Sequence, residues 1–141
     1  MKDAFDSSII VAALVPNENF HGECRQFVTA GGHIYQHGLV EVFNTLTGGR
    51  KPYQFRASLV ASMLVGKIEE TLAVTQLLPS ETNGAFGEAE SRGVRGGAIF
   101  DYLHLVAARK VGADRLVTLN LRHFQSFWRP GDPIVVHPGE A

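Results

Sequence analysis

The sequence predicts an α/β fold of three layers, α/β/α, in which a mainly parallel central sheet lies between helices. Two observations support this prediction. Short apolar runs alternate along the chain with longer segments whose apolar residues recur at helical spacing. Strands and helices that alternate in this way form right-handed crossovers and place helices on both faces of the sheet. The chain has 141 residues, of which 45% are hydrophobic, so we expect residues 1–141 to form one domain with a single core.

The overall charge of the chain does not indicate a nucleic-acid-binding surface. The formal net charge is -1, so any such surface must come from a local patch or from a partner. The one cysteine, Cys24, cannot form an internal disulfide, which fits a reducing cytoplasm, and we expect a small, half-buried side chain there. The apolar run 9–15 is too short to span a bilayer and lacks a signal-peptide cleavage pattern. We therefore expect a cytoplasmic protein that is not bound to a membrane.

Capping residues and glycines set the limits of the elements predicted in the first half of the chain. Asp6 and the two serines after it are good helix caps, because their oxygens accept free backbone amides, and Asn19 is the expected cap of the next helix. Pairs of glycines end the second and third helices. The predicted order is a strand ending at 4–6, helices over 9–14 and 20–29, a strand over 33–36 and a helix over 38–47.

The second half continues the alternation. Gly112 is the expected end of a long helix, and Asn120 is the expected cap of a short one. The segment 92–97 is predicted as a flexible basic loop. The other predicted elements are a helix over 55–65 after Pro52, a strand over 71–75, a loop and helix over 79–91, a helix over 98–111, a strand over 115–118, a helix over 121–127 and a strand over 133–136.

One acidic residue is unusual in its surroundings. The helix over 98–111 has apolar residues at helical spacing and around much of its surface, which predicts that it is mostly buried. Asp101 lies in the second turn of this helix, late for a charge that only complements the helix dipole. Because an aspartate is rarely buried unless it is paired or bound to a cation, Asp101 has the weakest purely structural interpretation.

Three further residues, Asp6, Glu41 and Asn120, have both an ordinary and a functional interpretation. Asp6 and Asn120 can each be a helix cap, and for each one alone this interpretation is favoured. Glu41 lies at the edge of an apolar helical stripe, where a solvated glutamate and a metal ligand are equally good interpretations. Asp6 and Asn120 both follow predicted strands. Since function in parallel sheets gathers at the carboxyl ends of strands, we expect them to come together.

Asp6, Glu41 and Asp101 together predict a metal site. Carboxylates that share a pocket repel one another and raise each other's pKa values, and a divalent cation compensates for this. Oxygen ligands favour Mg²⁺ or Mn²⁺. Such an ion lowers the pKa of a bound water that can attack a phosphodiester. Thr118 or Ser8 is expected to hydrogen-bond a carboxylate and fix its orientation.

In four segments the chain resembles PIN domains, and more narrowly the VapC-type toxins of toxin–antitoxin pairs. The segments are residues 5–8 (FDSS), 39–43 (LVEVF), 97–101 (GAIFD) and 116–120 (LVTLN), the last followed by Phe124. The resemblance implies a PIN-like fold and a Mg²⁺- or Mn²⁺-dependent endoribonuclease, with Asp6, Glu41 and Asp101 as metal ligands. Many members carry aspartate where this chain has Asn120. The amide adds no charge, so we expect one tightly bound metal, with any second metal arriving with RNA.

The resemblance also implies partners. RNA is the expected substrate, a cognate antitoxin is the expected protein partner, and homodimers are usual in the family. Antitoxins of this type usually bind in a hydrophobic groove between the early helices and the fourth helix. The helices predicted over 20–29 and 55–65 are therefore the expected walls of that groove.

Basic and aromatic residues near the acidic ones are candidates for RNA contacts, since phosphate contacts give affinity that does not depend on sequence. A solvated surface is the simpler interpretation of each basic residue, and the core is the simpler interpretation of each aromatic one. The basic candidates are Arg95 and Arg122, followed by Arg92, His123, Arg129 and the pair Arg50 and Lys51. The aromatic candidates are Tyr53, Phe55 and Trp128.

His104 has two interpretations, and the sequence leaves two alternative functions open. His104 follows Asp101 by three residues on the same helical face, so it either contacts the pocket or, as we favour, packs in the core. No pair of histidines has zinc-site spacing. One rival function is a metal-dependent phosphatase, although the common type has a second aspartate two residues after the first, which is missing after Asp6. The other is a non-catalytic binding module, which Asn120 supports.

Overall fold

A single parallel sheet organises the chain. The computed structural model describes residues 1–49 and 53–141. The described strands are β1 Asp3–Phe5, β2 His33–Tyr35, β3 Ala73–Thr75, β4 Arg115–Val117 and β5 Ile134–Val136. They form one sheet in the order β3-β2-β1-β4-β5, and each neighbouring pair is parallel. The predicted α/β class with a parallel sheet is confirmed.

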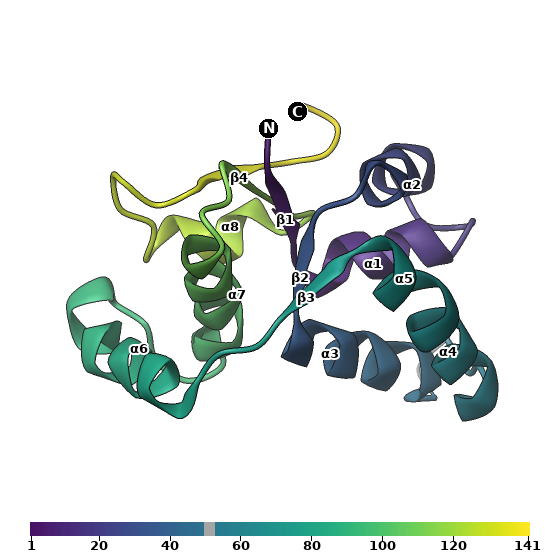
Figure 1. Ribbon diagram of the computed structural model, residues 1–141, viewed down its shortest axis with the longest axis horizontal. Helices are drawn as coiled ribbons and strands as arrows, with labels where there is room; N and C mark the ends of the chain where they lie inside the picture. Colours follow the sequence, from purple (N-terminus) through teal and green to yellow (C-terminus); the bar gives the residue numbers. More distant parts are fainter. Residues whose placement is uncertain (50–52) are drawn as a thin grey trace.

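Helices cover both faces of this sheet. The described helices are α1 Ser7–Leu14, α2 His21–Ala30, α3 Gln36–Thr47, α4 Ala57–Met63, the π-helical turn η1 Leu64–Ile68, α5 Glu69–Thr71, α6 Pro79–Arg92, α7 Ala98–Lys110 and α8 Leu121–Gln125. α1 to α5 lie on one side of the strands and α6 to α8 on the other, which gives the predicted three layers (Figure 1). Within the described residues, none of these helices is long and apolar enough to cross a membrane.

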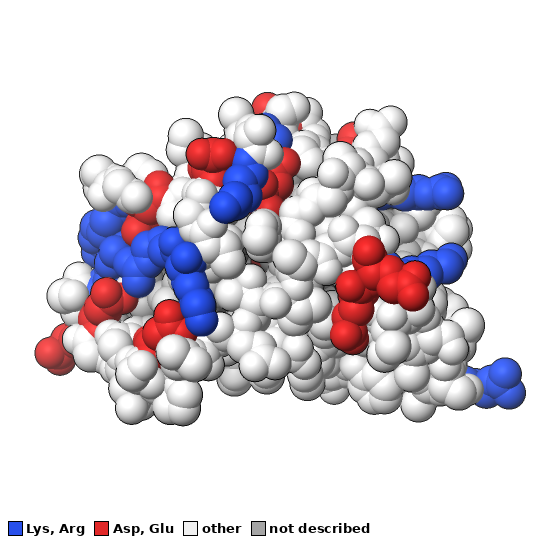
Figure 2. Space-filling view, viewed as in Figure 1, with Lys and Arg blue, Asp and Glu red and all other residues white. Residues whose placement is uncertain are grey.

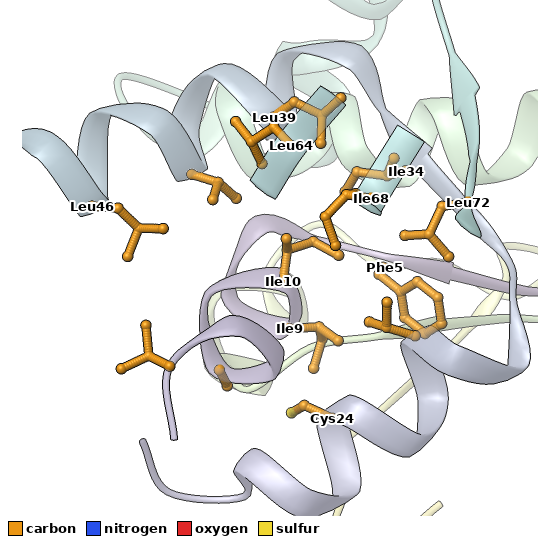
Figure 3. Packing of buried hydrophobic residues seen from close by; sticks show 14 of the residues in the cluster. Phe5, Ile9, Ile10, Cys24, Ile34, Leu39, Leu46, Leu64, Ile68 and Leu72 are labelled. Carbon is orange, nitrogen blue, oxygen red and sulfur yellow. The ribbon is translucent and has the colours of Figure 1, made fainter. Parts of the chain in front are cut away.

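The sheet separates two buried clusters of apolar side chains. Successive side chains of a strand point to opposite faces, so Ala4 and Phe5 of β1 belong to different clusters. Phe5 packs with residues of α1 to α5, among them Ile10 (Figure 3). Ala4 packs with residues of α7 and the chain after α8, among them Tyr102 and Phe127. Because β1 is buried on both faces, the residue that follows it is held at the centre of the molecule.

Cys24 lies in the cluster beside α1 and is fully buried, more deeply than predicted (Figure 3). Burial raises the pKa of its thiol to about 11, and the negative charges of Glu23 and Asp6 contribute to the rise. A thiol with this pKa stays protonated near neutral pH, so Cys24 has the packing role that the sequence indicated.

The helical segment that begins with α4 is longer than predicted. It does not end near residue 65 but continues through η1 and α5 to Thr71, so the next strand begins at Ala73 rather than at Thr71. The buried residues Val60, Leu64 and Ile68 recur every four residues. In a regular α-helix this spacing would turn them away from the core by roughly 40° per step, whereas a wider π turn keeps them facing it. Pro52, which precedes the segment, lies outside the described residues.

The starts of several helices differ from the prediction, and α4 begins at Ala57, two residues later than predicted. Asn19 does not cap α2, because Phe20 occupies the N-cap position with a left-handed backbone (φ 61°). α3 begins directly after β2, two residues earlier than predicted. The segment predicted as a loop and a helix is the single helix α6. Pro79 begins it, where no amide is needed, and the Leu78 N–H donates to Glu81 Oε1 at 2.7 Å.

Candidate active site

The carboxyl ends of β1 and β4 lie side by side in the middle of the sheet. The chain order reverses here, because β2 and β3 continue the sheet on one side of β1 while β4 and β5 continue it on the other. In open parallel sheets, ligands bind outside the strand ends at such a point. Asp6 directly follows β1, and Thr118 directly follows β4. The topology therefore places both residues where a ligand site is expected.

Asp6 is held by hydrogen bonds to both oxygens of its carboxylate. Oδ1 accepts from the N–H of Ser8 at 3.1 Å and from its hydroxyl at 2.5 Å, and Oδ2 accepts from the hydroxyl of Thr118 at 2.5 Å. The residue is only 2% exposed. The two hydroxyls in turn accept from the backbone N–H groups of Leu119 and Asn120. Asp6 thus caps α1 and is also fixed in orientation by the end of β4.

Asp101 lies in the first turn of α7, not in the second turn as predicted, so it also complements the helix dipole. Its side chain is 28% exposed, and Oδ2 lies 3.3 Å from Nδ1 of His123 in α8. Burial raises the pKa of Asp101, and the negative charges of Asp6 and Glu41 raise it further. His123 and His104 oppose that rise when they are protonated. Asp101 therefore interacts electrostatically with both Asp6 and Glu41.

Glu41 in α3 is paired with a histidine of α7. Its Oε1 lies 2.6 Å from Nε2 of His104, whose side chain is 2% exposed, against 27% for Glu41. Burial, followed by the charge of Glu41, raises the pKa of Tyr35, which lies edge-on to the His104 ring. Glu41 is therefore a paired, half-buried carboxylate, not a solvated one. His104 is buried, as favoured, and also contacts the site.

The donor chemistry of Asp6, Glu41 and Asp101 fits a hydrated Mg²⁺ or Mn²⁺ ion. Carboxylate oxygens are ligands that both ions favour. The pKa of Asp101 is raised first by burial and then by the negative charges of Asp6 and Glu41, which a cation would offset. In the part of the chain that the structure describes, no three such side chains are close enough to hold an ion directly. Since Mg²⁺ keeps several waters and takes one or two protein carboxylates, an ion bound partly through water suits this spacing.

Asn120 lies beside the residues that hold Asp6. It occupies the N-cap position of α8, as predicted, but its side chain makes no capping hydrogen bond. Its backbone N–H donates to Thr118 Oγ1 at 2.9 Å. Asn120 and Ser8 also help to line a pocket of about 320 Å³. The amide is exposed and contributes no charge to the carboxylate group.

Arg95 and Arg122 are both exposed and flank the elements that carry the site. Arg95 lies three residues before the first residue of α7, and Arg122 is the neighbour of His123 in α8. On the face shown in Figure 2, Lys and Arg side chains lie in small groups close to Asp and Glu side chains and form no continuous basic surface. This agrees with the near-zero net charge of the chain.

Other RNA-contact candidates belong to the fold instead. Arg92, predicted in a flexible loop, ends α6 and donates to Asp132 at 2.5 Å. Arg129 donates to backbone carbonyls of Ser126 and Trp128. Both arginines therefore stabilise the turn after α8, and their predicted role in RNA contacts is not supported. The candidates Arg50 and Lys51 lie outside the described residues.

The aromatic candidates for RNA contacts pack against the hydrophobic core, which was the simpler interpretation of each. Tyr53 and Phe55 pack against the cluster on the α1 to α5 side, and Trp128 packs against the other cluster. The indole N–H of Trp128 donates to the carbonyl of Pro133 at 2.9 Å. These rings are partly buried packing residues.

Two histidine contacts of the site were not predicted as pairs. Glu41 and His104 lie 63 residues apart, and the spacing of His104 from Asp101 showed only that these two share a helical face. His123 was grouped with the phosphate-binding candidates, and no sequence pattern linked it to Asp101. Both contacts depend on how α3, α7 and α8 pack together.

No protein-family model matches the chain, and no curated protein sequence matches it either. Several solved structures are similar to it in fold. VapC20 of Mycobacterium tuberculosis, a sarcin-ricin loop cleaving toxin, has a TM-score of 0.69 and 14% identity, over 94% of this chain and 100% of its own. The DNA-bound VapBC of Salmonella typhimurium gives 0.67 and 18%, over 98% of each chain. A toxin–antitoxin complex from Klebsiella pneumoniae gives 0.63 and 20%, over 99% and 100%.

The chain has the PIN-like fold of the VapC toxins. The likeness extends over nearly the full length of both chains in each comparison, so it includes all the elements that carry the site. At these identities, what is shared with VapC20 and the VapBC proteins is the fold. The chemistry of this chain has to be argued from its own residues.

Proposed function

We propose that this protein is a Mg²⁺- or Mn²⁺-dependent endoribonuclease that acts as the toxin of a toxin–antitoxin pair. The observation that carries the proposal is the buried carboxylate of Asp6 outside the ends of β1 and β4, with Asp101 close enough to both Asp6 and Glu41 for their charges to add to the rise in its pKa, in a chain with the fold of VapC toxins. VapC20 is a sarcin-ricin loop cleaving toxin. Carboxylates that bind a divalent cation are suited to hydrolysis of a phosphodiester by water.

The residues have different parts in this proposal. Asp6 is the rigid ligand, because Ser8 and Thr118 fix its orientation. Glu41 and Asp101 complete the negative charge of the site from two other helices. A bound Mg²⁺ or Mn²⁺ would lower the pKa of its water and stabilise charge on the phosphate. Asn120 offers a neutral oxygen beside Asp6 for a weakly bound second ion or the attacking water.

Two arginines and the pocket at Asn120 would position the RNA. Arg95 and Arg122 are exposed and would bind phosphates through charge, without selecting a sequence. The pocket of about 320 Å³ beside Asn120 is bordered by both polar and apolar groups, such as Thr45 and Val11. It lies next to the proposed metal ligands, where the chain on one side of the scissile phosphate would pass.

The test of this proposal is RNA cleavage by the purified protein. With Mg²⁺ or Mn²⁺ present we expect internal cleavage of RNA, and chelation with EDTA should stop it. Asp101→Asn and Asp6→Asn each remove a charge that binds the cation, so each should lower the cleavage rate by roughly 100-fold or more. Cleavage is followed on an end-labelled RNA, with folding of each variant checked by circular dichroism.

Glu70→Gln is the matched control, because it removes a carboxylate charge from the exposed surface of α5, away from the site. It should cleave at the wild-type rate. Wild-type cleavage by Asp101→Asn would contradict the metal assignment. Hydrolysis of a small phosphomonoester in preference to RNA would favour the phosphatase, and a folded chain that cleaves neither substrate at millimolar Mn²⁺ would favour the binding module.

A pocket of about 410 Å³ lies where the antitoxin groove is expected, between α1, α2 and the helical segment that begins with α4. Its apolar lining includes Leu14 of α1, Val28 of α2 and Met63 of α4, and the exposed basic residues Arg25 and Lys67 border it. This combination suits an amphipathic helix with an apolar face and acidic residues at its edge. The Klebsiella pneumoniae structure is a toxin–antitoxin complex. We therefore assign this groove to the antitoxin.

A further inference from the structure

His104 stands out among the buried polar side chains. Its side chain is 2% exposed, and Nε2 makes its one hydrogen bond, to Glu41 Oε1 at 2.6 Å. Its Nδ1 is the only buried side-chain nitrogen or oxygen without a hydrogen-bond partner among residues 1–49 and 53–141. Burying an imidazole with half of its hydrogen-bonding capacity unused costs free energy, so a reason for keeping it there is needed.

The unpartnered Nδ1 determines which way the ring donates. In a neutral imidazole, one nitrogen carries a proton and the other is an acceptor. If Nδ1 carried the proton, a donor would be buried without a partner, and the bare Nε2 would face the carboxylate of Glu41. With the proton on Nε2, the ring donates to Glu41 and only a lone pair at Nδ1 is unused. The contacts therefore favour His104 as the donor to Glu41.

The surroundings of His104 hold its ring in one place. Tyr35 lies edge-on to the ring, with the centroids 5.6 Å apart. Gly38 of α3 passes so close that a Cβ there would lie 2.8 Å from Cε1 of His104. A glycine at this position leaves room for the ring, and Nε2 then reaches Glu41, three residues further along the same helix. The hydrogen bond thus joins α7 to α3.

This connection links two of the proposed metal ligands. His104 lies one helical turn after Asp101 in α7, and it binds Glu41 in α3. A glutamate has a long, flexible side chain, and fixing it costs conformational entropy. A carboxylate already held by a buried donor has lost much of that freedom before the metal binds. Asp6 is held in the corresponding way by Thr118 and Ser8.

We propose that His104 is a positioning residue, which holds the carboxylate of Glu41 toward Asp101 for metal binding. The inference rests on the proposed function. Residues that hydrogen-bond a metal ligand, without binding the metal themselves, typically contribute 10-fold to 100-fold to metal affinity. His104 touches neither RNA nor the reacting atoms in this role, so its effect should appear in the binding of the metal alone.

The experiment is titration of the purified protein with Mn²⁺ in the absence of RNA. Isothermal titration calorimetry measures the dissociation constant. His104→Leu keeps the apolar volume but has no donor, and should raise the dissociation constant for Mn²⁺ by roughly 10-fold or more. His104→Gln retains an N–H donor and should restore most of the affinity. Val106→Ala removes buried volume from the same helix without a partner in the site, and should lower the melting temperature while Mn²⁺ affinity stays at the wild-type value.

The outcomes separate this inference from the proposed function. If the wild type and His104→Leu bind Mn²⁺ equally well, the positioning role is wrong and the metal site stands. If His104→Leu binds more tightly, the histidine competes with the metal for Glu41, which also overturns the inference. Equal losses in His104→Gln and His104→Leu would assign the effect to packing. A wild type that binds no Mn²⁺ would overturn both proposals.

Discussion

At the scale of single residues, the two most buried aspartates have partners of different kinds. Asp6 and Asp132 are 2% and 9% exposed. Asp132 is bound by the guanidinium of Arg92, which neutralises its charge. Asp6 is bound by hydroxyl and amide groups, and within the described residues no lysine, arginine or histidine forms an ion pair with it. The partners of Asp6 orient its charge without cancelling it, which leaves that charge for a cation.

Asp132→Asn is expected to make the protein less stable, and by an amount that depends on pH. Although burial raises the pKa of Asp132, the hydrogen bonds from Arg92 and from the Arg129 N–H, with the nearby positive charges, lower it below its usual value. The ionised form therefore stabilises the fold at pH values above about 3.9, the usual pKa. This contribution is lost as the pH falls through the lower folded-state pKa. At pH 7 the loss should be about 2 to 3 kcal/mol.

The measurement is the free energy of unfolding in urea, compared for the two proteins at pH 7 and at progressively lower pH. The difference between wild type and Asp132→Asn should shrink as the pH drops below about 4. Glu90→Gln, at an exposed position of α6, should have little effect at any pH. An Asp132→Asn loss of the same size throughout would mean that packing, not charge, holds this turn.

At the scale of elements, the close packing of α3 against β2 and α7 sets the geometry around Glu41. Gly38 is buried in the first turn of α3, directly after β2. A Cβ there would lie 2.8 Å from His104 Cε1 and 3.0 Å from Ile34 Cδ1, both of which are buried. The absence of a side chain at Gly38 therefore lets the two helices approach closely enough for Glu41 and His104 to meet.

Gly38→Ala is expected to destabilise the protein by about 1 to 2 kcal/mol, because the overpacking cost exceeds the gain in helix propensity. The matched control is Gly84→Ala in the interior of α6, where a Cβ would meet nothing within 4 Å. Since alanine is the better helix former, this control should gain roughly 0.5 to 1 kcal/mol. The free energy of unfolding in urea is measured for both variants. Equal stabilisation by the two substitutions would contradict the close packing of Gly38 against His104 and Ile34.

At the scale of the whole molecule, the proposed catalytic site and the proposed antitoxin groove occupy different places on one fold. The site lies outside the ends of β1 and β4, whereas the groove lies between α2 and the helical segment that begins with α4. Both use α1, since Ser8 near its start binds Asp6 and Leu14 at its end lines the groove. Because none of the proposed metal ligands lines the groove, substitutions can alter one surface without altering the other.

The double variant Arg25→Glu and Lys67→Glu should weaken binding of the antitoxin, because it reverses both charges beside the groove. Each such charge is worth up to about 1 kcal/mol, so reversing both should raise the dissociation constant roughly 10-fold or more. Binding of the antitoxin is measured by titration of the two purified proteins. Metal-dependent RNA cleavage by the variant should be unchanged.

Arg56→Glu provides the control, because Arg56 is exposed at the start of α4 but does not line the groove. It should bind the antitoxin with wild-type affinity. If all three charge reversals weaken binding to the same degree, attraction between the net charges of the two proteins explains the effect, and the groove assignment is wrong.

The order of elements was predictable from the sequence because it depends on local properties. Apolar spacing separated helices from strands, and their alternation indicated a parallel sheet covered on both faces. The sequence predicts Asp6 as a helix cap, which the structure confirms, and its position at the end of a strand makes it a candidate site residue. Asp101 was recognised because a charge in an apolar helix needs a partner.

Long-range packing decided the rest. The bonds of Asp6 to Thr118 and of Glu41 to His104 join residues 112 and 63 positions apart, and these pairs exist only once the strand order and the helix contacts are set. The π turn η1 likewise arises because Val60, Leu64 and Ile68 must all face one core. Residue types and local spacing thus determined the elements and the charged groups of this protein. Only the tertiary structure decided their partners, because a side chain's partner depends on which distant segments the fold brings beside it.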